Sequence, residues 1–267
     1  MKNFADLTYR IYSKVKAKKP LIHHITNFVV MNDTANLTLA LGASPVMAHA
    51  KEEVEDMTTL SDALVLNVGT LTKEWIESMI LSAKIANKKG IPVILDPVGA
   101  GATSFRTEMS FQILESCRVS ILRGNNGEIS TLAGFKAHAK GVDSLQGADP
   151  MQVVRDAALK FNCVVVVTGK EDVVSDGKRT VVISNGHELL TTITGSGCMV
   201  TTAIAVVSAV HTDLLESAVS ALSIFGIAAE IAATKAKGPG SFKVYLFDHI
   251  HKLSQKEIEH RIKIREI

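Results

Sequence analysis

The sequence of 267 residues is poor in cysteine and carries almost no net charge. Its three cysteines, Cys117, Cys163 and Cys198, lie far apart, and no two of them form a Cys-x-x-Cys pair. Such spacing predicts neither a disulfide framework nor a cysteine-based zinc site. The 29 lysines and arginines and the 27 acidic residues leave a formal net charge of +2, which argues against a dedicated nucleic-acid-binding protein.

The sequence also lacks a recognisable leader and a clear membrane span. Its first residues, Met1 to Asp6, are too polar for a signal peptide. The longest apolar stretches lie between Gly197 and Ala233, and three polar residues divide them: His211, Asp213 and Glu216. We expect the resulting pieces to be shorter than the roughly 20 residues that a membrane helix needs. They predict two buried helices of a cytoplasmic protein that has no membrane partner.

The chain does have enough apolar sequence for a sizeable core. Hydrophobic residues make up 46% of the sequence and charged residues 21%, which is typical of folded globular proteins. No Pro-, Gly- or Ser-rich linker, internal repeat or low-complexity tract divides the sequence. A chain of this length fits one large domain or two small ones, and without a linker we predict a single domain over residues 1–267.

Short apolar runs alternate with helical patterns along the chain. Ala63 to Val68 predicts a buried strand, and Thr72 to Lys89 predicts a helix that Gly90 ends. The pattern continues with strands expected over 91–95, 119–122 and 163–167 and helices over 33–41, 107–116, 126–132 and 149–161. Continuously hydrophobic strands between helices are typical of a parallel sheet covered on both faces. The predicted fold class is therefore α/β, with three layers (α/β/α) and a mostly parallel central sheet.

Two segments depart from this alternation. Asp172 to Ser175 and Thr180 to Ser184 flank Asp176-Gly177, which predicts a hairpin and a small antiparallel edge of the sheet. The charged, amphipathic sequence from Asp248 to about Ile264 is expected to continue the C-terminal helices.

Polar residues and glycines recur where the predicted strands end. These ends read Asn67-Val-Gly-Thr, Asp96-Pro-Val-Gly, Arg123-Gly-Asn and Thr168-Gly-Lys. Ligands of open parallel sheets bind outside the carboxyl ends of the strands, so a site is expected here.

Asp96 places a carboxylate at one of these ends, before a loop that contains Gly99 and Gly101. The two glycines match part of a dinucleotide-binding fingerprint, but Ser104 occupies the place of the third glycine. No Gly-Lys-Ser/Thr phosphate-binding loop occurs in the sequence. The alternative interpretation is a tight turn in which Asp96 caps a helix.

Arg123 and Glu128 belong to a neighbouring strand end. The planar guanidinium of Arg123 suits a phosphate group. Glu128 opens the next predicted helix, where it can share a hydrated Mg²⁺ with Asp96. The alternative for Glu128 is a charge that complements the helix dipole.

The segment Thr194-Gly-Ser-Gly-Cys-Met199 leads into a long apolar run, Val200 to Val210. A glycine-rich loop that opens a buried helix provides free N–H groups and the positive end of the dipole, which together suit an anion. Cys198 lies there, and the same field is expected to favour its thiolate. The alternative is a loop that only caps a core helix, with Cys198 as a small buried apolar residue.

Asn27 and Met47 are candidates for a small-molecule pocket, because an amide can orient a ligand and a methionine can cover an aromatic ring. Without further context, both are more typical of core or loop residues. The histidines His23, His24 and His49 have no metal-like spacing with Cys, Asp or Glu, and they are expected to be structural.

Taken together, these motifs resemble those of the hydroxyethylthiazole kinase family. The matching segments run in order from about Leu21 to Phe242: His24-Ile-Thr-Asn-Phe-Val, Asn67-Val-Gly-Thr, Asp96-Pro-Val-Gly-Ala-Gly, Arg123-Gly-Asn-x-x-Glu128, Val167-Thr-Gly, Thr194-Gly-Ser-Gly-Cys-Met and Gly238-Pro-Gly-Ser-Phe. The combination is specific, although each segment alone is not. Residues 1–19 and the sequence after Phe242 match least.

The resemblance implies a ribokinase-like fold and ATP-dependent phosphorylation of 4-methyl-5-(2-hydroxyethyl)thiazole, a step of thiamin salvage. It also implies a homotrimer with its sites at subunit interfaces. By position it implies roles for these residues: Asn27, Met47 and Gly195 for the thiazole, Arg123 and Thr168 for ATP, and Asp96 and Glu128 for Mg²⁺. Cys198 would take the place of the aspartate base of other ribokinase-like enzymes, while backbone N–H groups from Gly195 through Gly197 to Cys198 would face the transferring phosphoryl group.

Three other functions stay open at this point. The chain could be a kinase for another small alcohol, such as a hydroxymethylpyrimidine. A cysteine hydrolase or acyltransferase would use Cys198 as its nucleophile and would need a nearby histidine, for which His187 and His211 are nearest in the sequence. A non-catalytic thiazole or nucleotide sensor is the third possibility, although the full set of phosphate and metal residues argues against it.

Overall fold

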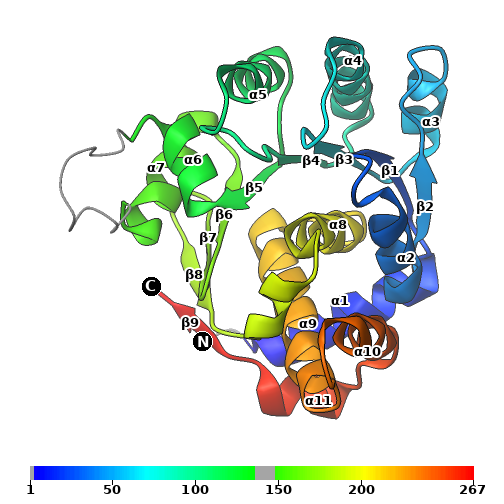
Figure 1. The fold of residues 1–267 in the computed structure, drawn as a ribbon, viewed down its shortest axis with the longest axis vertical. Coiled ribbons are helices and arrows are strands. Elements are labelled where there is room, and N and C mark those ends of the chain that lie inside the picture. The colour runs from blue at the N-terminus through cyan, green and yellow to red at the C-terminus, as the bar shows by residue number, and fades with distance from the viewer. Residues whose placement is uncertain (1–2, 136–147) are drawn as a thin grey trace.

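A computed structural model describes residues 3–135 and 148–267. The first two residues of the polar N-terminal segment, Met1 and Lys2, lie outside the described residues. Its strands form one sheet in the order β2-β1-β3-β4-β5-β6-β7-β8-β9 (Figure 1). The strands are β1 (Leu21–Ile25), β2 (Ser44–Met47), β3 (Ala63–Asn67), β4 (Val93–Asp96), β5 (Ile121–Asn125), β6 (Val164–Thr168), β7 (Asp172–Ser175), β8 (Thr180–Ile183) and β9 (Ile264–Glu266). Strands β2 to β6 pair in parallel, and β6 to β9 pair antiparallel, which confirms the predicted parallel sheet with an antiparallel edge.

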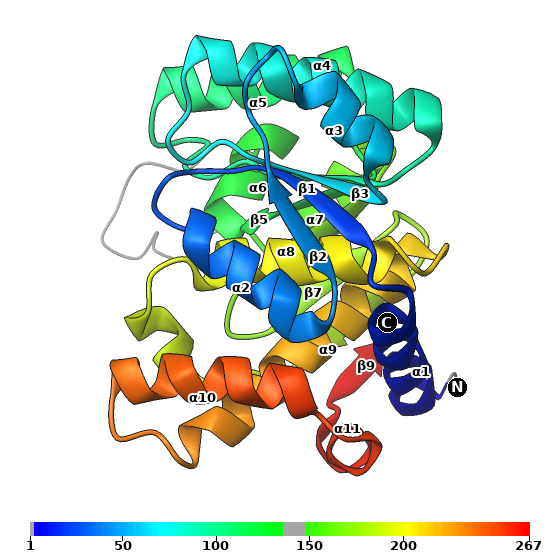
Figure 2. The same cartoon turned by 90° about the vertical axis from the view of Figure 1, so that its right-hand side faces the viewer.

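Helices cover both faces of this sheet, as predicted for a three-layer α/β/α fold. They are α1 (Phe4–Lys18), α2 (Met31–Leu41), α3 (Val54–Leu60), α4 (Lys73–Lys89), α5 (Ser104–Ser116), α6 (Asn126–Ala133), α7 (Pro150–Phe161), α8 (Ser196–Ser208), α9 (Leu214–Ala233), α10 (Pro239–Lys252) and α11 (Gln255–Arg261). Figure 2 shows α3 to α5 above the sheet and α8 to α10 below it. A short 3₁₀ helix, η1 (Glu188–Thr192), leads into α8.

The two faces of the sheet have separate hydrophobic cores, and the alternation along each strand assigns residues to them. On β3, Ala63 and Val65 belong to the core that holds α8 and α9, whereas Leu64 and Leu66 belong to the core under α4 and α5. Successive strand residues point to opposite faces, so a strand that is buried on both faces must be apolar throughout. This explains why these strands show no polar alternation in the sequence.

Helix α4 confirms the boundary signals in the sequence. Thr72 Oγ1 accepts the N–H of Trp75 at 3.2 Å, and Gly90 ends the helix with a φ of 80°. That left-handed conformation favours glycine, because other residues place Cβ too close to the backbone.

Most predicted boundaries differ from the observed ones by one or two residues, and larger differences concern β5, α5 and the C-terminal segment. β5 continues to Asn125, so Arg123 lies within the strand rather than after it. Thr103 caps α5, which therefore begins at Ser104 and not near 107. The prediction of continuous helix from Asp248 to about Ile264 is wrong. The chain leaves α10 after Lys252, Ser254 caps the short α11, and Ile264 begins β9, which completes the sheet beside β8.

The length argument against a membrane helix is also wrong for α9. Leu214–Ala233 is 20 residues long and apolar enough to cross a membrane by composition, because Asp213 and Glu216 fall at its first turn rather than in its middle. However, 89% of its apolar window is buried inside the protein, where α9 packs against α8, α10 and α1. Both α8 and α9 are therefore buried core helices, as predicted.

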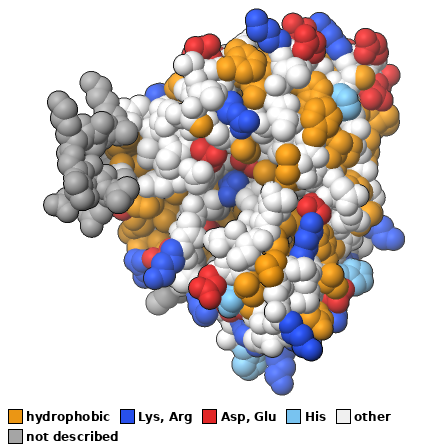
Figure 3. Space-filling model, viewed as in Figure 1, with side chains coloured by type: hydrophobic (Ala, Val, Ile, Leu, Met, Phe, Trp, Pro, Cys, Tyr) orange, Lys and Arg blue, Asp and Glu red, His pale blue; other side chains and the backbone are white. Residues whose placement is uncertain are grey.

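Figure 3 shows basic and acidic side chains interspersed over one face of the molecule, with no large patch of one charge sign.

Candidate active site

The carboxyl ends of neighbouring strands bring the predicted polar residues together. We call this side of the sheet, where the parallel strands end, the carboxyl edge. Asn67 of β3 pairs with Asp96 of β4 in the parallel register. Asn125 of β5 pairs with Thr168 of β6, and Arg123 lies two residues earlier on β5. Helix α8 packs against β3 and β4, so its first turns close over this edge.

Asp96 is fully buried at this edge. Its Oδ2 accepts hydrogen bonds from Thr201 Oγ1 at 2.8 Å, Asn67 Nδ2 at 3.0 Å and Arg123 Nη1 at 3.4 Å. Burial raises the pKa of Asp96, and the nearby Arg123 guanidinium opposes that rise. Its other oxygen, Oδ1, has no hydrogen-bond partner among the described residues. The interpretation of Asp96 as a helix cap is therefore wrong, and one of its oxygens has a free acceptor site.

Cys198 lies in the first turn of α8 beside this carboxylate. Its Sγ accepts hydrogen bonds from Asn67 Nδ2 at 3.2 Å and from Asn27 Nδ2 at 3.7 Å. Burial, followed by the Asp96 carboxylate, raises the pKa of Cys198 to about 11. The expectation of a favoured thiolate is therefore wrong, because burial and the Asp96 carboxylate outweigh the two amide donors and Arg123, and a pKa of about 11 favours the neutral thiol near pH 7.

The hydrolase alternative needs a histidine base beside this thiol. Over the described ranges, the side-chain hydrogen bonds of Cys198 Sγ come from asparagines. His187 Nδ1 accepts the N–H of Leu189 at 3.2 Å. His211 Nε2 lies 2.9 Å from Glu216 Oε2. The two histidines nearest in the sequence are thus engaged elsewhere, and nothing in this geometry resembles a nucleophile–base pair.

The three residues predicted for a thiazole lie at different depths. Asn27 is buried, and its amide joins the Asp96 cluster by donating to Asn67 Oδ1 at 2.8 Å. Gly195 precedes α8 with a φ of 78°, and a Cβ there would collide with the side chain of Val30. Met47 ends the edge strand β2, where it is half-buried and pairs with His24 of β1. The structure thus ties Asn27 directly to the cluster and leaves Met47 at the sheet edge.

Arg123 lies between the Asp96 cluster, formed by Asp96, Asn67, Cys198 and Asn27, and an open cavity. It is 8% exposed, and its guanidinium bonds both Asp96 Oδ2 and Thr168 Oγ1. It also packs against the first turn of α8, where a Cβ on Gly197 would lie 2.7 Å from Nη1. Glycine at 197 therefore permits the close approach of a cation to the positive end of this helix.

Glu128 is held in place by two backbone donors. Its Oε1 accepts the N–H of Gly99 and its Oε2 that of Asn125, both at 2.8 Å. Asn125 and Glu128 form a capping box, which confirms the interpretation of Glu128 as a charge at a helix start. Each Glu128 oxygen keeps a second acceptor site, and Asp96 Oδ1 accepts no bond from the described residues.

This donor set fits Mg²⁺ better than a transition metal. Within the described residues, no cluster of three or more His, Cys, Asp or Glu side chains is arranged to hold a metal directly. Mg²⁺ commonly uses one or two carboxylates and keeps several waters, so Asp96 and Glu128 suit it as partners of a hydrated ion. His23, His24 and His49 contribute no such cluster. The first two are buried on β1, where His23 Nε2 lies 2.7 Å from the carbonyl oxygen of Ala48.

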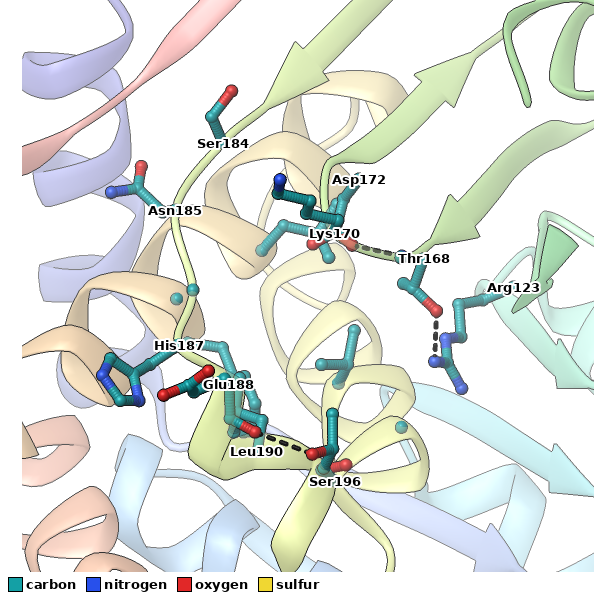
Figure 4. A pocket seen from close by; sticks show the side chains of 18 residues that line it. Arg123, Thr168, Lys170, Asp172, Ser184, Asn185, His187, Glu188, Leu190 and Ser196 are labelled. Carbon is teal, nitrogen blue, oxygen red and sulfur yellow. Dashed lines mark hydrogen bonds between the residues drawn. The ribbon is translucent and has the colours of Figure 1, made fainter. Parts of the chain in front are cut away.

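A cavity of about 830 Å³ opens next to Arg123 (Figure 4). Both polar and apolar side chains line it, and they include Arg123, Thr168, Lys170, Asp172, Ser196, Leu190, Val200, Leu222 and Phe225. The volume lies within the usual range for sites of small-molecule ligands and cofactors. Gly197 and Ser196 place the first turn of α8 in the cavity wall, and no side chain caps that turn. The uncapped turn thus places the positive end of the helix dipole beside the cavity, an arrangement that suits an anion.

Two residues of the cluster had no predicted role. Asn67 was recognised only as the polar end of a strand, yet its side chain bonds Asp96, Cys198 and Asn27. Thr201 was counted as part of the apolar run, but it lies three residues after Cys198 and so shares its side of the helix. The spacing of three residues could have indicated that Thr201 belongs to the site. The bonds of Asn67 could not be predicted in this way, because its partners Asn27, Asp96 and Cys198 come from three distant segments of the chain.

Comparisons with known proteins agree with the motifs at this edge. The Hydroxyethylthiazole kinase family matches residues 12–256. A hydroxyethylthiazole kinase of Desulfatibacillum aliphaticivorans is 56% identical over 259 residues, which cover 97% of each chain. A solved hydroxyethylthiazole kinase structure from Pyrococcus horikoshii OT3 superposes with a TM-score of 0.91 at 48% identity, over 98% of this chain and 99% of that one. A ribokinase-like superfamily protein of Enterococcus faecalis shares the fold at 11% identity, with a TM-score of 0.65 over 91% and 89% of the two chains.

Proposed function

The chain belongs to the hydroxyethylthiazole kinase family, and from this premise we propose that it phosphorylates 4-methyl-5-(2-hydroxyethyl)thiazole with ATP. The products are the thiazole phosphate and ADP, as in thiamin salvage. One observation carries the proposal: Arg123 lines the cavity and also bonds Asp96, which Asn67 links to Cys198 and Asn27. The phosphate end of a nucleotide site thereby meets a cluster that can hold an alcohol.

Phosphoryl transfer needs positioning and charge stabilisation more than covalent chemistry. In this proposal, Thr168 and Arg123 bind the phosphates of ATP in the cavity. The uncapped first turn of α8, including Gly195 and Gly197, directs N–H groups at the transferring phosphoryl group. Arg123 is well placed to balance the charge that develops there, because its guanidinium already lies against Gly197.

Asp96 and Glu128 would hold the Mg²⁺ that accompanies ATP. When bound, the ion neutralises phosphate charge. Glu128 contributes a carboxylate fixed by Gly99 and Asn125, and Asp96 contributes Oδ1, which accepts no bond from the described residues. A buried acceptor without a donor is unfavourable, so a water bound to a cation would satisfy it.

Cys198 would orient the substrate hydroxyl rather than act as a strong base. A thiol with a pKa of about 11 is almost fully protonated at pH 7, so only a small fraction can accept a proton. We infer that its share of catalysis is modest and that the amide of Asn27 fixes the thiazole in the adjoining pocket with Met47 and Gly195.

We propose that the enzyme is a homotrimer with its sites at subunit interfaces, in which a second subunit completes the thiazole pocket beside Asn27. Phe28 and Val29 follow Asn27 directly, and they are 64% and 61% exposed. Met47 lies on β2, at the edge of the sheet. A second subunit against these residues would bury two large apolar side chains and close the pocket. We further propose that residues 1–267 act as one kinase domain, which the continuous sheet supports, and that the enzyme is cytoplasmic.

The experiment that tests this function measures ADP release with Mg-ATP and a panel of small alcohols. The panel includes hydroxyethylthiazole and a hydroxymethylpyrimidine, and phosphorylated products are identified by mass spectrometry. Selective turnover of the thiazole supports the proposal. Selective turnover of another alcohol would keep the kinase chemistry but overturn the substrate assignment. Folded protein that binds ATP and turns over no alcohol would favour a sensor instead.

A further inference from the structure

We propose that Asn67 is a positioning residue for phosphoryl transfer, with its side-chain amide holding Asp96, Cys198 and Asn27 in a fixed arrangement. Asn67 ends β3 and is 1% exposed. Its amide makes four hydrogen bonds, two through each polar atom. The inference rests on the proposed kinase function, because the groups that Asn67 holds are those assigned to the transfer.

The orientation of this amide follows from a backbone group. The N–H of Gly69 can only donate, and it lies 3.0 Å from Asn67 Oδ1. Nδ2 must therefore point to the other side, where it meets Asp96 Oδ2 at 3.0 Å and Cys198 Sγ at 3.2 Å. The same logic fixes Asn27, because its Oδ1 accepts the N–H of Val29 at 3.1 Å while its Nδ2 donates to Asn67 Oδ1.

Asn67 thus separates its contacts by function. Its oxygen shapes the chain by bonding the turn at Gly69 and the Asn27 side chain. Its nitrogen donates to two acceptors, the Asp96 carboxylate and the Cys198 sulfur. Without Asn67, neither acceptor would receive a hydrogen bond from β3. An amide at this point brings a carboxylate and a sulfur close together and limits how far either can rotate.

The substitution Asn67→Asp separates the contacts of the amide oxygen from those of the amide nitrogen experimentally. Aspartate has the shape of asparagine and keeps an oxygen for Gly69 and Asn27. It cannot donate when ionised, and when protonated beside Asp96 it has a single O–H where the amide has two N–H groups, so it cannot serve both Asp96 Oδ2 and Cys198 Sγ. Asn67→Asp therefore removes at least one contact to the transfer groups and keeps those that shape the chain.

We expect Asn67→Asp to lower kcat about a hundredfold, a loss that a misplacement of the reacting groups by about 1 Å can cause. KM for Mg-ATP should stay within about threefold of the wild-type value, because the nucleotide cavity does not include Asn67. Asn67→Ser keeps one short hydroxyl and should lie between the two, which provides a second variant should aspartate prevent folding.

Two control variants distinguish positioning from a general loss of stability. Asn87→Asp removes a comparable amide, which bonds Arg118 through both its oxygen and its nitrogen far from this edge. It should lower the melting temperature and leave kcat unchanged. Thr201→Val removes another donor to Asp96 Oδ2 without touching Cys198 or Asn27, and it should reduce kcat less than Asn67→Asp does.

A second readout does not depend on kinase activity. Iodoacetamide alkylation of Cys198 at pH 9, followed on its peptide by mass spectrometry, should slow about fivefold in Asn67→Asp and Asn67→Ser, because the sulfur loses a donor that stabilises its reactive form. In Thr201→Val the rate should not slow. If the wild-type protein phosphorylates no thiazole but the variants show this alkylation pattern, the proposed function is overturned and the positioning role is not. Folded Asn67 variants with wild-type kcat, or with unchanged alkylation, would overturn the positioning role.

Discussion

Two adjoining regions of this protein are built in opposite ways. The transfer cluster, defined as Asn27, Asn67, Asp96, Cys198 and Thr201, consists of short side chains from the ends of β3 and β4, the loop after β1 and the first turns of α8. All but Cys198 are at most 4% exposed, and each side chain bonds another member. The cavity next to it, which we propose binds the nucleotide and call the nucleotide cavity, is open, and long exposed side chains such as Lys170 and Glu188 line it.

The difference shows where the protein needs accuracy. Reacting groups must be held to a fraction of an ångström, and short side chains on regular elements allow little rotation. A nucleotide is large and provides many contacts, so its site can tolerate a softer wall. Arg123 and Gly197 lie at the junction, because Arg123 contacts Asp96 and also lines the cavity, where Gly197 packs against it.

Removal of Arg123 should have the largest effect because it damages both regions. Arg123→Ala is expected to lower kcat/KM for Mg-ATP about a thousandfold. It also leaves Asp96 without its cationic partner, which should lower the free energy of unfolding by about 2–4 kcal/mol. Steady-state kinetics and denaturant unfolding measure the two effects. Arg118→Ala, at an exposed arginine, should change neither. A fully active Arg123→Ala protein would contradict the assignment.

A methyl group at position 197 should affect the junction alone. The Cβ of Gly197→Ala would lie 2.7 Å from Arg123 Nη1, so the guanidinium must move. We expect KM for Mg-ATP to rise roughly thirtyfold, about 2 kcal/mol, while the melting temperature stays the same or rises, since alanine favours helix. Gly240→Ala is the matched control, because no atom lies within 4 Å of its added Cβ in the first turn of α10. Equal kinetics for the two variants would show that Arg123 tolerates displacement.

Substitutions of Cys198 test the cluster without altering the cavity. Cys198→Ala should lower kcat about tenfold, much less than Arg123→Ala, because a neutral thiol contributes little as a base. Cys198→Asp should keep or raise kcat, since a carboxylate accepts the hydroxyl proton more readily. Cys117→Ala, at the end of α5, serves as the control. A Cys198→Asp protein that still binds ATP but is inactive would count against this role.

Asp172 should have the smallest effect, and its effect should depend on pH. Burial raises the pKa of Asp172 to about 6, and its Oδ1 accepts the N–H of Gly169 at 3.1 Å in the cavity wall. Above pH 6 the carboxylate is charged and repels a triphosphate, whereas below pH 6 it becomes neutral. Wild-type KM for Mg-ATP should therefore be about threefold lower at pH 5.5 than at pH 7.5.

The substitution Asp172→Asn tests this directly, because it keeps an acceptor for the N–H of Gly169 and removes the charge. The variant should show the low KM at both pH values. A wild-type KM that rises as the pH falls would mean that Asp172 does not face the phosphates.

The elements of the fold were largely predictable because their signals are local. Thr72 and Gly90 delimit α4 by capping and by a left-handed turn, which need only a few neighbouring residues. Strand β9 was not predictable, because the three residues that form it are polar or isolated and become a strand only beside β8. Within the site, strand ends indicated Asp96 and Arg123, whereas the bonds of Asn67 join residues 40, 29 and 131 positions away.

By itself, the sequence determined which residue types stand at the strand ends and at the start of α8, because periodicity, caps and glycines are short-range features. The tertiary structure decided their chemical state. Cys198 lies at a helix N-terminus that should favour a thiolate, yet burial and the neighbouring Asp96 keep it protonated. Desolvation and the approach of charges from other strands depend on packing of the whole chain, and no local pattern contains them.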